Sequence, residues 1–223
     1  MELQFYYKER FMKLFVLLII IFGKTFANEN TSTVCKINRS KELQTIVKTS
    51  QDARKNFENL TQEQLNLLGK KDNEHLLRIE KIFKEGCLTS SEDFAAAAMV
   101  FQYGATSKHF FQSFLWAKKA VELGDTTQKR LMALSIDRYL ISINHKQIFA
   151  SQAFKPDRPK NSCWCLEMVE KSFPDKLRLH YMGNNLNAQI TWLKGLNKNN
   201  KCPQIYCNKK RKNSPKGTVP GFW

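Results

Sequence analysis

The sequence lacks the residue patterns that most directly indicate catalysis. The four histidines are scattered along the chain, without the short spacing of paired metal ligands: His75, His109, His145 and His180. No serine lies in a nucleophile-elbow motif, and no motif of a nucleic-acid-binding fold is present. The sequence therefore predicts no metal and no cofactor. It gives no direct sign of a metalloenzyme, a serine hydrolase or a sequence-specific nucleic-acid-binding protein.

Long stretches of alternating apolar and polar residues are also missing, which argues against β-strands. Apolar residues recur at helical spacing instead, first from Ser40 to Phe57. The residues "TQEQ" at 61–64 match a capping box. Asp72 is placed to cap the stretch "NEHLLRIEKIFKEG", which ends at Gly86 as helices commonly do. These patterns predict two or three helices in the first third of the chain.

The middle of the chain carries the clearest helix signals. Ser90 is placed to cap "SSEDFAAAAMVFQYG", whose alanines allow a neighbouring helix to approach closely. Two more helices are predicted in "TSKHFFQSFLWAKKAVELG" and "DTTQKRLMALSIDRYLISINH". Because the connections are short, successive helices are expected to pack antiparallel. No segment repeats at a fixed period, so a compact domain is favoured over a helical solenoid.

The fold class predicted from these patterns is all-α: a compact bundle of antiparallel helices with a disulfide-linked, basic C-terminal extension. The helical domain spans residues 40–154, and a hydrophobic content of 42% is enough to give it a packed core. A cysteine-containing extension spans 155–207, with short helices expected around 166–171 and 186–196. A basic tail spans residues 208–223.

The N-terminal 27 residues have the pattern of a secretory signal peptide. "MKLFVLLIIIFGKTFA" at 12–27 has a lysine, a short apolar run and a small residue at Ala27, after which cleavage is expected. The preceding "MELQFYYKERF" is either a long basic region or the result of a start assigned before Met12. The apolar run is short for a membrane anchor. We therefore predict an exported protein, periplasmic or secreted, in which residues 28–39 form a linker.

An even number of cysteines in an exported chain favours disulfide bonds. The disulfide candidates are Cys35, Cys87, Cys163, Cys165, Cys202 and Cys207. The pairing that we favour joins "CWC" to "CPQIYC", which would fasten the C-terminal segment to the body of the protein. A four-thiolate metal site from the same two motifs is the alternative. A single residue between the first two cysteines is tighter than zinc sites usually have.

The charge balance is strongly basic, with a formal net charge of +16. From Lys194 to the end of the sequence there are seven lysines and one arginine but no acidic residue. The densest run consists of Lys209, Lys210, Arg211 and Lys212. These residues are candidates for binding an anionic surface, such as lipid headgroups or glycolipid, through their electric field. The alternative is a solvated, flexible tail whose charge serves only solubility.

A group of polar residues in apolar surroundings is the candidate functional site. Asp137 has apolar neighbours three and four positions away on its helix, so its carboxylate is expected to be buried and to need a partner. Arg138 points about 100° away from it and must pair elsewhere. The candidate site comprises Gln102, Tyr103, Asp137, Arg138, Gln147 and Gln152. These residues are expected to meet either as a buried hydrogen-bond network or as the floor of a pocket.

Four stretches, "DFAAAAMVFQYG", "AKKAVELG", "SIDRYL" and "KQIFASQ", resemble a bacterial domain family of unknown function found mostly in exported proteins. That family has Q-H at the end of an alanine-rich helix, then D-R, then P-Q-x-Y-G-T-Q. The resemblance covers roughly residues 60–154 and implies the same helical fold and site location. This chain has Tyr103 where the family has histidine, and Ala150 and Ser151 where it has glycine and threonine, so any role of that histidine is lost here.

The function that these observations favour is a non-catalytic binding or interaction module of the cell envelope. Its partner would be an envelope protein or an anionic surface. The first alternative is a hydrolase-like or other enzyme in which Asp137 acts as acid or base, Arg138 clamps an anion and glutamines orient the substrate. The second alternative is binding of anionic membrane or glycolipid through the basic tail. A purely structural role of the polar residues, fastening helices and loop together, is the competing interpretation.

Overall fold

A computed structural model describes residues 35, 37–155, 163–197, 202 and 204–223 of the chain. All of them belong to one compact unit, Val34–Trp223. The predicted signal peptide and most of the predicted linker lie outside the described residues. Within the described part, no helix has the length and apolar character needed to cross a bilayer.

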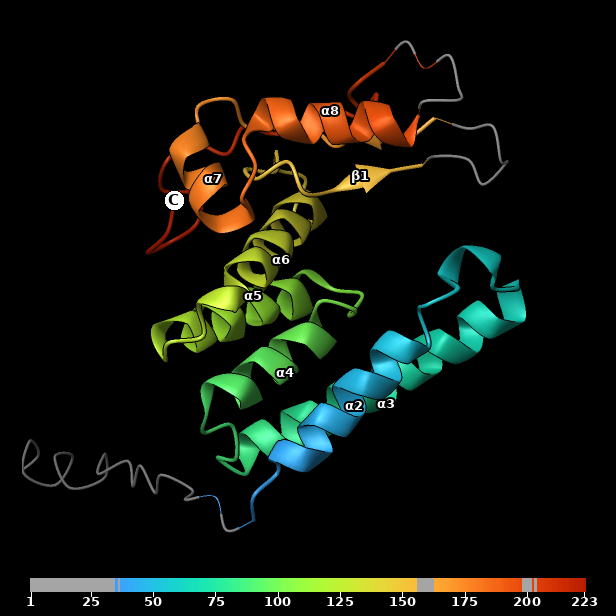
Figure 1. The fold of residues 1–223 in the computed structure, drawn as a ribbon, viewed down its shortest axis with the longest axis vertical. Coiled ribbons are helices and arrows are strands. Elements are labelled where there is room, and N and C mark those ends of the chain that lie inside the picture. Colours follow the sequence, from blue (N-terminus) through green and yellow to red (C-terminus); the bar gives the residue numbers. More distant parts are fainter. Residues whose placement is uncertain (1–34, 36, 156–162, 198–201, 203) are drawn as a thin grey trace, which may run out of the picture. The chain divides into compact units, whose positions relative to one another are not determined.

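The described residues form a mostly helical fold, as predicted (Figure 1). The α-helices are α2 (Ser40–Asp52), α3 (Gln62–Lys84), α4 (Ser91–Phe101), α5 (Ser107–Glu122), α6 (Lys129–Ser142), α7 (Asp175–Met182) and α8 (Leu186–Leu196). Single 3-10 turns lie at η1 (Phe57–Asn59) and η2 (Thr126–Gln128). A small antiparallel sheet pairs β1 (Ala153–Phe154) with β2 (Cys165–Leu166).

Capping residues set the starts of α3 and α4 as the sequence predicts. The Thr61 hydroxyl accepts a hydrogen bond from the Gln64 amide, and the Gln64 side chain accepts one from the Thr61 amide. Ser90 and Asp93 form the equivalent capping box at α4. The expectation that Asp72 starts a separate helix was wrong, because α3 continues through it without a break and its carboxylate pairs with Arg54 instead.

The structure departs from the prediction in three further places, two of them in the second half of the chain. Residues 165–166 form a strand rather than the start of a short helix, because they pair with β1 and because Leu166 exchanges backbone hydrogen bonds with the segment 205–207. That segment is distant in sequence and is held there by a disulfide, so local periodicity carries no sign of it. Helix α7 was missed, although Asp175 in its first turn and Gly183 after its last residue are ordinary helix signals. Phe57 is 49% exposed rather than on a buried helix face.

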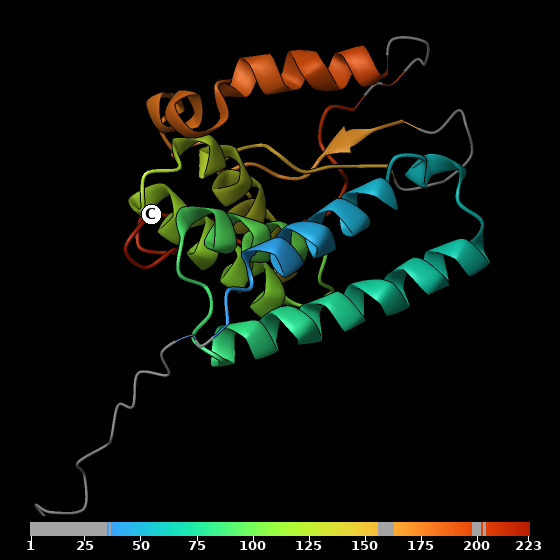
Figure 2. The ribbon, with the colours of Figure 1, turned by 60° about the horizontal axis from the view of Figure 1, so that its bottom comes forward.

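The core is built where α4, α5 and α6 pack against one another in succession (Figure 1). Fully buried alanines on all three helices let their backbones approach closely: Ala97, Ala98, Ala117, Ala120 and Ala133. Two buried hydroxyls join the three helices. Ser113 Oγ donates to the Ala98 carbonyl at 2.7 Å and lies 2.7 Å from Ser135 Oγ. In Figure 2, α2 lies between α3 and this group of helices.

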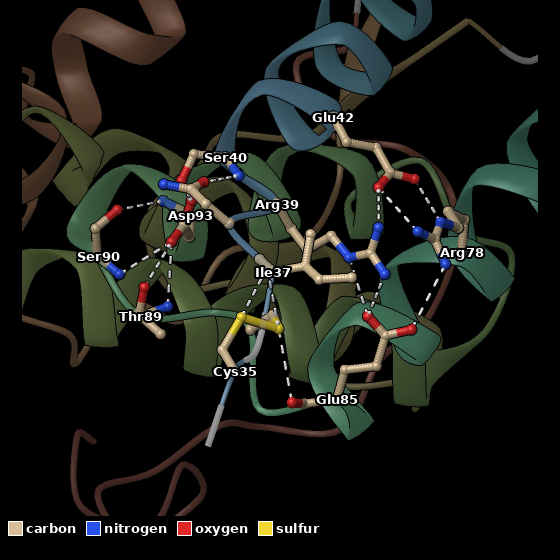
Figure 3. The surroundings of a disulfide bond; sticks show 12 residues. Cys35, Ile37, Arg39, Ser40, Glu42, Arg78, Glu85, Thr89, Ser90 and Asp93 are labelled. Carbon is tan, nitrogen blue, oxygen red and sulfur yellow. Dashed lines mark hydrogen bonds and ion pairs between the residues drawn. A yellow bond between two sulfur atoms is a disulfide. The ribbon is translucent and has the colours of Figure 1, made fainter. Parts of the chain in front are cut away.

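The disulfide Cys35–Cys87 fastens the start of α2 to the segment between α3 and α4 (Figure 3). Beside it, two arginines and two glutamates alternate in one ion-pair network. Arg39 contacts both Glu42 and Glu85, and Arg78 contacts the same two carboxylates. Asp93 is buried nearby and accepts hydrogen bonds from Ser40 and the Thr89–Ser90 backbone. This end of α2 is therefore fixed covalently and electrostatically.

The two remaining disulfides are Cys163–Cys202 and Cys165–Cys207. They join "CWC" to "CPQIYC", so the pairing favoured from the sequence is confirmed. The alternative of a four-thiolate metal site was wrong, because all four sulfur atoms are consumed in these bonds. Disulfides are typical of proteins that fold in an oxidising compartment.

The last residues of the C-terminal segment are packed against the core, so the expectation of a flexible tail was wrong, although its lysines are exposed to solvent. The Trp223 indole donates to the Ser214 carbonyl at 2.8 Å. The centroids of the Trp223 and Phe173 rings lie 4.9 Å apart. Phe222 contacts the rings of Phe114 and Tyr181. Burial of these aromatic rings stabilises the packed position of the segment, because each ring removes a large apolar area from water. The preceding lysines do not prevent this packing.

Candidate functional site

The carboxylate of Asp137 is sealed inside the protein and holds the loop 147–152 by its backbone. Its Oδ1 accepts hydrogen bonds from the amides of Ile148 (2.8 Å) and Phe149 (3.0 Å). Its Oδ2 accepts from the Ser151 amide (2.9 Å) and hydroxyl (2.8 Å). Burial raises the pKa of Asp137 above its ordinary value, and these hydrogen bonds oppose the rise.

The loop held by Asp137 contains a residue with a positive φ, and the side chains of Gln147 and Arg178 also hold the loop by hydrogen bonds. Ala150 has a φ of 60°, in the left-handed region that favours glycine. The Gln147 side chain accepts a hydrogen bond from the Gln152 amide and donates to the Gln152 carbonyl, which closes the loop. The buried guanidinium of Arg178 donates to the Ile148 carbonyl at 2.8 Å. Carboxylate, amide and guanidinium groups together determine this conformation.

Arg138, next to Asp137 on α6, points the other way and joins the loop to the end of α4. Its Nε donates to Gln152 Oε1 at 3.2 Å, and its Nη1 donates to the Gln102 carbonyl. The Gln152 amide nitrogen also reaches Ser151 Oγ at 2.9 Å. The structure thus brings Gln102, Arg138 and Gln152 into one hydrogen-bonded group, whereas Asp137 and Gln147 serve the loop behind it.

This group forms part of the lining of an open cleft of about 780 Å³. The volume lies within the range typical of small-ligand sites. Polar groups from Gln102, Tyr103, Arg138 and Gln152 line part of the cleft. The apolar part is formed by Phe57, Leu65, Leu68, Phe110, Ile141 and Phe154. Asp137 is not among the lining residues, so it meets no molecule bound in the cleft.

Arg54, Asp72 and Tyr103 form a second polar group in the cleft. The guanidinium of Arg54 forms an ion pair with the Asp72 carboxylate. It also lies over the Tyr103 ring, with 3.6 Å between the guanidinium carbon and the ring centroid. These contacts explain why Tyr103 is only half buried yet held in place. The positive charge of Arg54 is neutralised within the cleft, because its partner Asp72 is part of the same cleft lining.

The charge of Arg138 is not balanced in this way. Among the described residues no carboxylate lies within ion-pair distance of Arg138, and its partners, Gln102 and Gln152, are neutral. Glu167, which also lines the cleft, is paired with Arg211 at 2.7 Å. Burial lowers the pKa of Arg138, and the nearby charge of Arg54 lowers it further. The cleft therefore contains one arginine whose positive charge has no counterion within the described part of the chain.

Gly69 lies on the face of α3 that lines the cleft, in the interior of the helix. A Cβ atom added at this position would meet nothing within 4 Å, so no neighbouring group requires a glycine here. Glycine inside a helix costs about 1 kcal/mol relative to alanine. The residue leaves open space in the cleft at a cost to the stability of α3.

The basic run 209–212 is divided by the fold. Lys209, Lys210 and Lys212 are exposed, whereas the Arg211 side chain is only 2% exposed. Arg211 pairs with Glu167 and donates to the Ile141 carbonyl at 2.8 Å. Three of the four anion-binding candidates therefore face solvent, and the fourth supports the wall of the cleft.

Two arginines that support the cleft and its loop, Arg54 and Arg178, were not foreseen from the sequence. Arg54 follows α2, and Arg178 lies on α7 with its side chain buried among backbone carbonyls. An arginine flanked by leucines in "KLRLHYM" is a signal for Arg178, because a buried guanidinium needs several acceptors. No comparable signal exists for Arg54, which donates to the Ser50 carbonyl of α2 and otherwise contacts Asp72 of α3 and Tyr103 after α4. Within the described residues, no group of three or more metal-ligating side chains occurs.

Comparison with known proteins finds no matching family model, no similar curated protein and no similar solved structure. The resemblance to the bacterial exported domain family therefore stays a prediction.

Proposed function

We propose that this protein is an exported, non-catalytic binding module of the cell envelope, which holds a small ligand in the cleft beside Arg138. In this proposal the helices form a compact antiparallel bundle, and the disulfide-linked extension with its lysine-rich segment completes one side of it. The proposal also places the chain with the bacterial exported domain family of unknown function. The single observation that carries the proposal is the cleft itself.

Export is supported by two independent features. The three disulfides need an oxidising compartment to form and persist. The sequence at 12–27 has the basic start, apolar run and small-residue end of a signal peptide. A periplasmic or secreted location accounts for both.

Ligand binding is supported by how the cleft is built. Its volume of about 780 Å³ suits a small molecule, and its lining combines apolar side chains with a few polar groups, as ligand sites usually do. The loop 147–152 is held by Asp137, Gln147 and Arg178, so Gln152 is positioned before any ligand arrives. Such preorganisation reduces the entropy lost on binding.

Binding is favoured over catalysis because the candidate acid or base does not reach the cleft. Asp137 is fully buried and all four of its hydrogen bonds are accepted from the loop. A general acid or base must lie within hydrogen-bond reach of the group that it protonates or deprotonates. In the proposed role Asp137 positions the loop, and Arg138 contacts the ligand.

The proposal is tested with N-phenyl-1-naphthylamine, a neutral dye whose fluorescence rises in apolar sites. The variant Gly69→Phe places a ring in the open space of the cleft. The matched control is Gly195→Phe on α8, where an added Cβ also meets nothing within 4 Å and which does not line the cleft. Both variants add the same apolar side chain at a helical glycine.

We expect the wild-type protein and the Gly195→Phe variant to bind the dye equally. The Gly69→Phe variant should bind it about tenfold more weakly or not at all, because the ring occupies the site. Absence of dye binding to the wild type, or equal binding by both variants, would show that the cleft is not a ligand site.

A further inference from the structure

We infer that the ligand of this cleft is an amphiphilic carboxylate, a molecule that joins one carboxylate to an apolar group. The inference rests on the proposed function and adds the chemical class of the ligand. In it, the carboxylate binds at Arg138, and the apolar group lies against the aromatic and aliphatic wall of the cleft.

The preference for an anion follows from the unbalanced charge of Arg138. Its Nε and Nη1 are used by Gln152 and Gln102, whereas among the described residues its Nη2 donates to no protein group. Arg138 lines the cleft, so these remaining donors are available to a molecule bound there. A planar guanidinium edge matches a carboxylate well, and hydrogen bonds between charged groups are stronger than neutral ones.

The surroundings of Arg138 favour one negative charge rather than several. Asp72 and Glu167 also line the cleft, and each is already paired with its own arginine. A ligand carrying several negative charges would approach these two carboxylates as well as Arg138 and would be repelled by them. A single carboxylate balances the positive charge of Arg138, which has no counterion among the described residues of the cleft.

The preference for an apolar group follows from two phenylalanines at the cleft. Phe57 in η1 is 49% exposed and Phe154 in β1 is 53% exposed, and both line the cleft. They come from segments far apart in sequence and would be covered by a ligand that extends from Arg138. Burying apolar surface contributes about 25 cal/mol per Å². Gly69 leaves room for the ligand on the α3 side.

The inference is tested by competition against N-phenyl-1-naphthylamine with three probes. Octanoate carries the full chemistry, 1-octanol has the same chain without the charge, and acetate has the charge without the chain. The three are compared on the wild-type protein and on Arg138→Gln. The matched control is Arg130→Gln, which removes an exposed arginine from the same helix.

We expect octanoate to displace the dye from the wild type at concentrations about tenfold or more below those of 1-octanol and acetate. Arg138→Gln should abolish the preference of octanoate over 1-octanol, and Arg130→Gln should retain it. Folding of each variant is checked by circular dichroism. If Arg138→Gln does not fold, the comparison of the three probes on the wild type still decides the matter.

Two results would overturn the inference and leave the proposed function intact. If 1-octanol displaces the dye as well as octanoate does, the charge of Arg138 does not select the ligand. If acetate competes as well as octanoate, the apolar wall plays no part. Failure of the dye itself to bind the wild type would instead contradict the proposed function.

Discussion

Asp137 and Arg138 are adjacent in sequence but serve opposite sides of α6. Asp137 accepts hydrogen bonds from backbone amides of the loop 147–152, whereas Arg138 donates to the Gln102 carbonyl at the end of α4 and to the Gln152 side chain at the end of that loop. A buried carboxylate surrounded by donors acts as an anchor for backbone that would otherwise adopt another conformation. The proposed ligand contact depends on this anchor without touching it.

Replacing Asp137 with asparagine should destabilise the protein by about 2–4 kcal/mol. The Ser151 amide and hydroxyl both donate to Oδ2 of Asp137. In asparagine an NH2 group replaces this oxygen and cannot accept these two hydrogen bonds. The measurement is the free energy of unfolding in urea with the disulfides intact. Asp52→Asn, which changes an exposed carboxylate on α2, should alter stability by less than about 1 kcal/mol. Equal effects of the two substitutions would contradict the anchoring role.

The backbone conformation of Ala150 gives a second prediction at this scale. Ala133 and Ala150 are both fully buried, but only Ala150 has a positive φ. Ala133→Gly should cost about 1–2 kcal/mol, because glycine is unfavourable within a helix. Ala150→Gly should cost at least about 1 kcal/mol less, since relief of the left-handed conformation offsets the lost methyl group. Thermal unfolding compares the two, and equal losses would show that the loop is unstrained.

The pair α2 and α3 is joined by one buried hydrogen bond that depends on the charge of a histidine. Ser50 Oγ lies 2.8 Å from His75 Nδ1, and both side chains are buried. Burial lowers the pKa of His75 below its ordinary value of 6.5, and the nearby Lys71 lowers it further. Neutral His75 is therefore favoured in the folded protein, where its Nδ1 shares a hydrogen bond with the serine hydroxyl.

Stability should consequently fall as the pH is lowered below about 6.5. In the range between the ordinary pKa and the lowered pKa of His75, the unfolded chain binds more protons than the folded one, so acid favours unfolding. The measurement is the free energy of unfolding between pH 7.5 and 5. His75→Gln should reduce this pH dependence, whereas His180→Gln, which changes an exposed histidine, should leave it unchanged. A wild-type slope retained in His75→Gln would contradict the assignment.

Elements specified by local chemistry could be predicted from the sequence, and those specified by distant contacts could not. The capping boxes at Thr61 and Ser90 are complete within four residues, and the sequence predicted the first as a capping box and the second as a helix start capped by Ser90. Strand β2 depends on its pairing with β1, on backbone hydrogen bonds to 205–207 and on the disulfide Cys165–Cys207, and none of these contacts leaves a local pattern. Helix α7 lies between these extremes, because its end at Gly183 is a local signal in a short, weakly periodic segment.

The whole molecule is held by disulfides in its outer segments and by an aromatic cluster that includes its last residues. Phe222 and Trp223 pack among Phe114, Phe149 and Phe173. The segment that carries the exposed Lys209, Lys210 and Lys212 is thus continuous with the core. Its lysines are presented by a fixed backbone rather than by a mobile tail.

Trp223→Ala should therefore destabilise the protein by about 2–4 kcal/mol, because it removes a ring contact with Phe173 and a hydrogen bond to Ser214. Replacing the exposed Lys209 and Lys210 with glutamine should change stability by less than about 0.5 kcal/mol each. Denaturant unfolding measures both. A negligible effect of Trp223→Ala would mean that the C-terminal segment does not belong to the core.

The sequence could predict which residues form the candidate site, but not which of them line a cleft and which lie behind it. Polar side chains on apolar helix faces at Gln102 and Asp137 indicated where buried hydrogen bonds would lie. The sequence could not show that Asp137 faces the loop and Arg138 the cleft, since this depends on how α6 is rotated against its neighbours. The contribution of α3 through Gly69 was also out of reach, because nothing local relates it to Arg138.

The most direct test of the central claim is to locate bound octanoate by nuclear magnetic resonance, using nuclear Overhauser effects between the ligand and assigned protein protons. The account predicts contacts from the octanoate chain to Phe154 and Ile141, with the chain end next to the carboxylate close to Arg138. Contacts confined to residues outside the cleft, or a chain whose carboxylate end points away from Arg138, would contradict it.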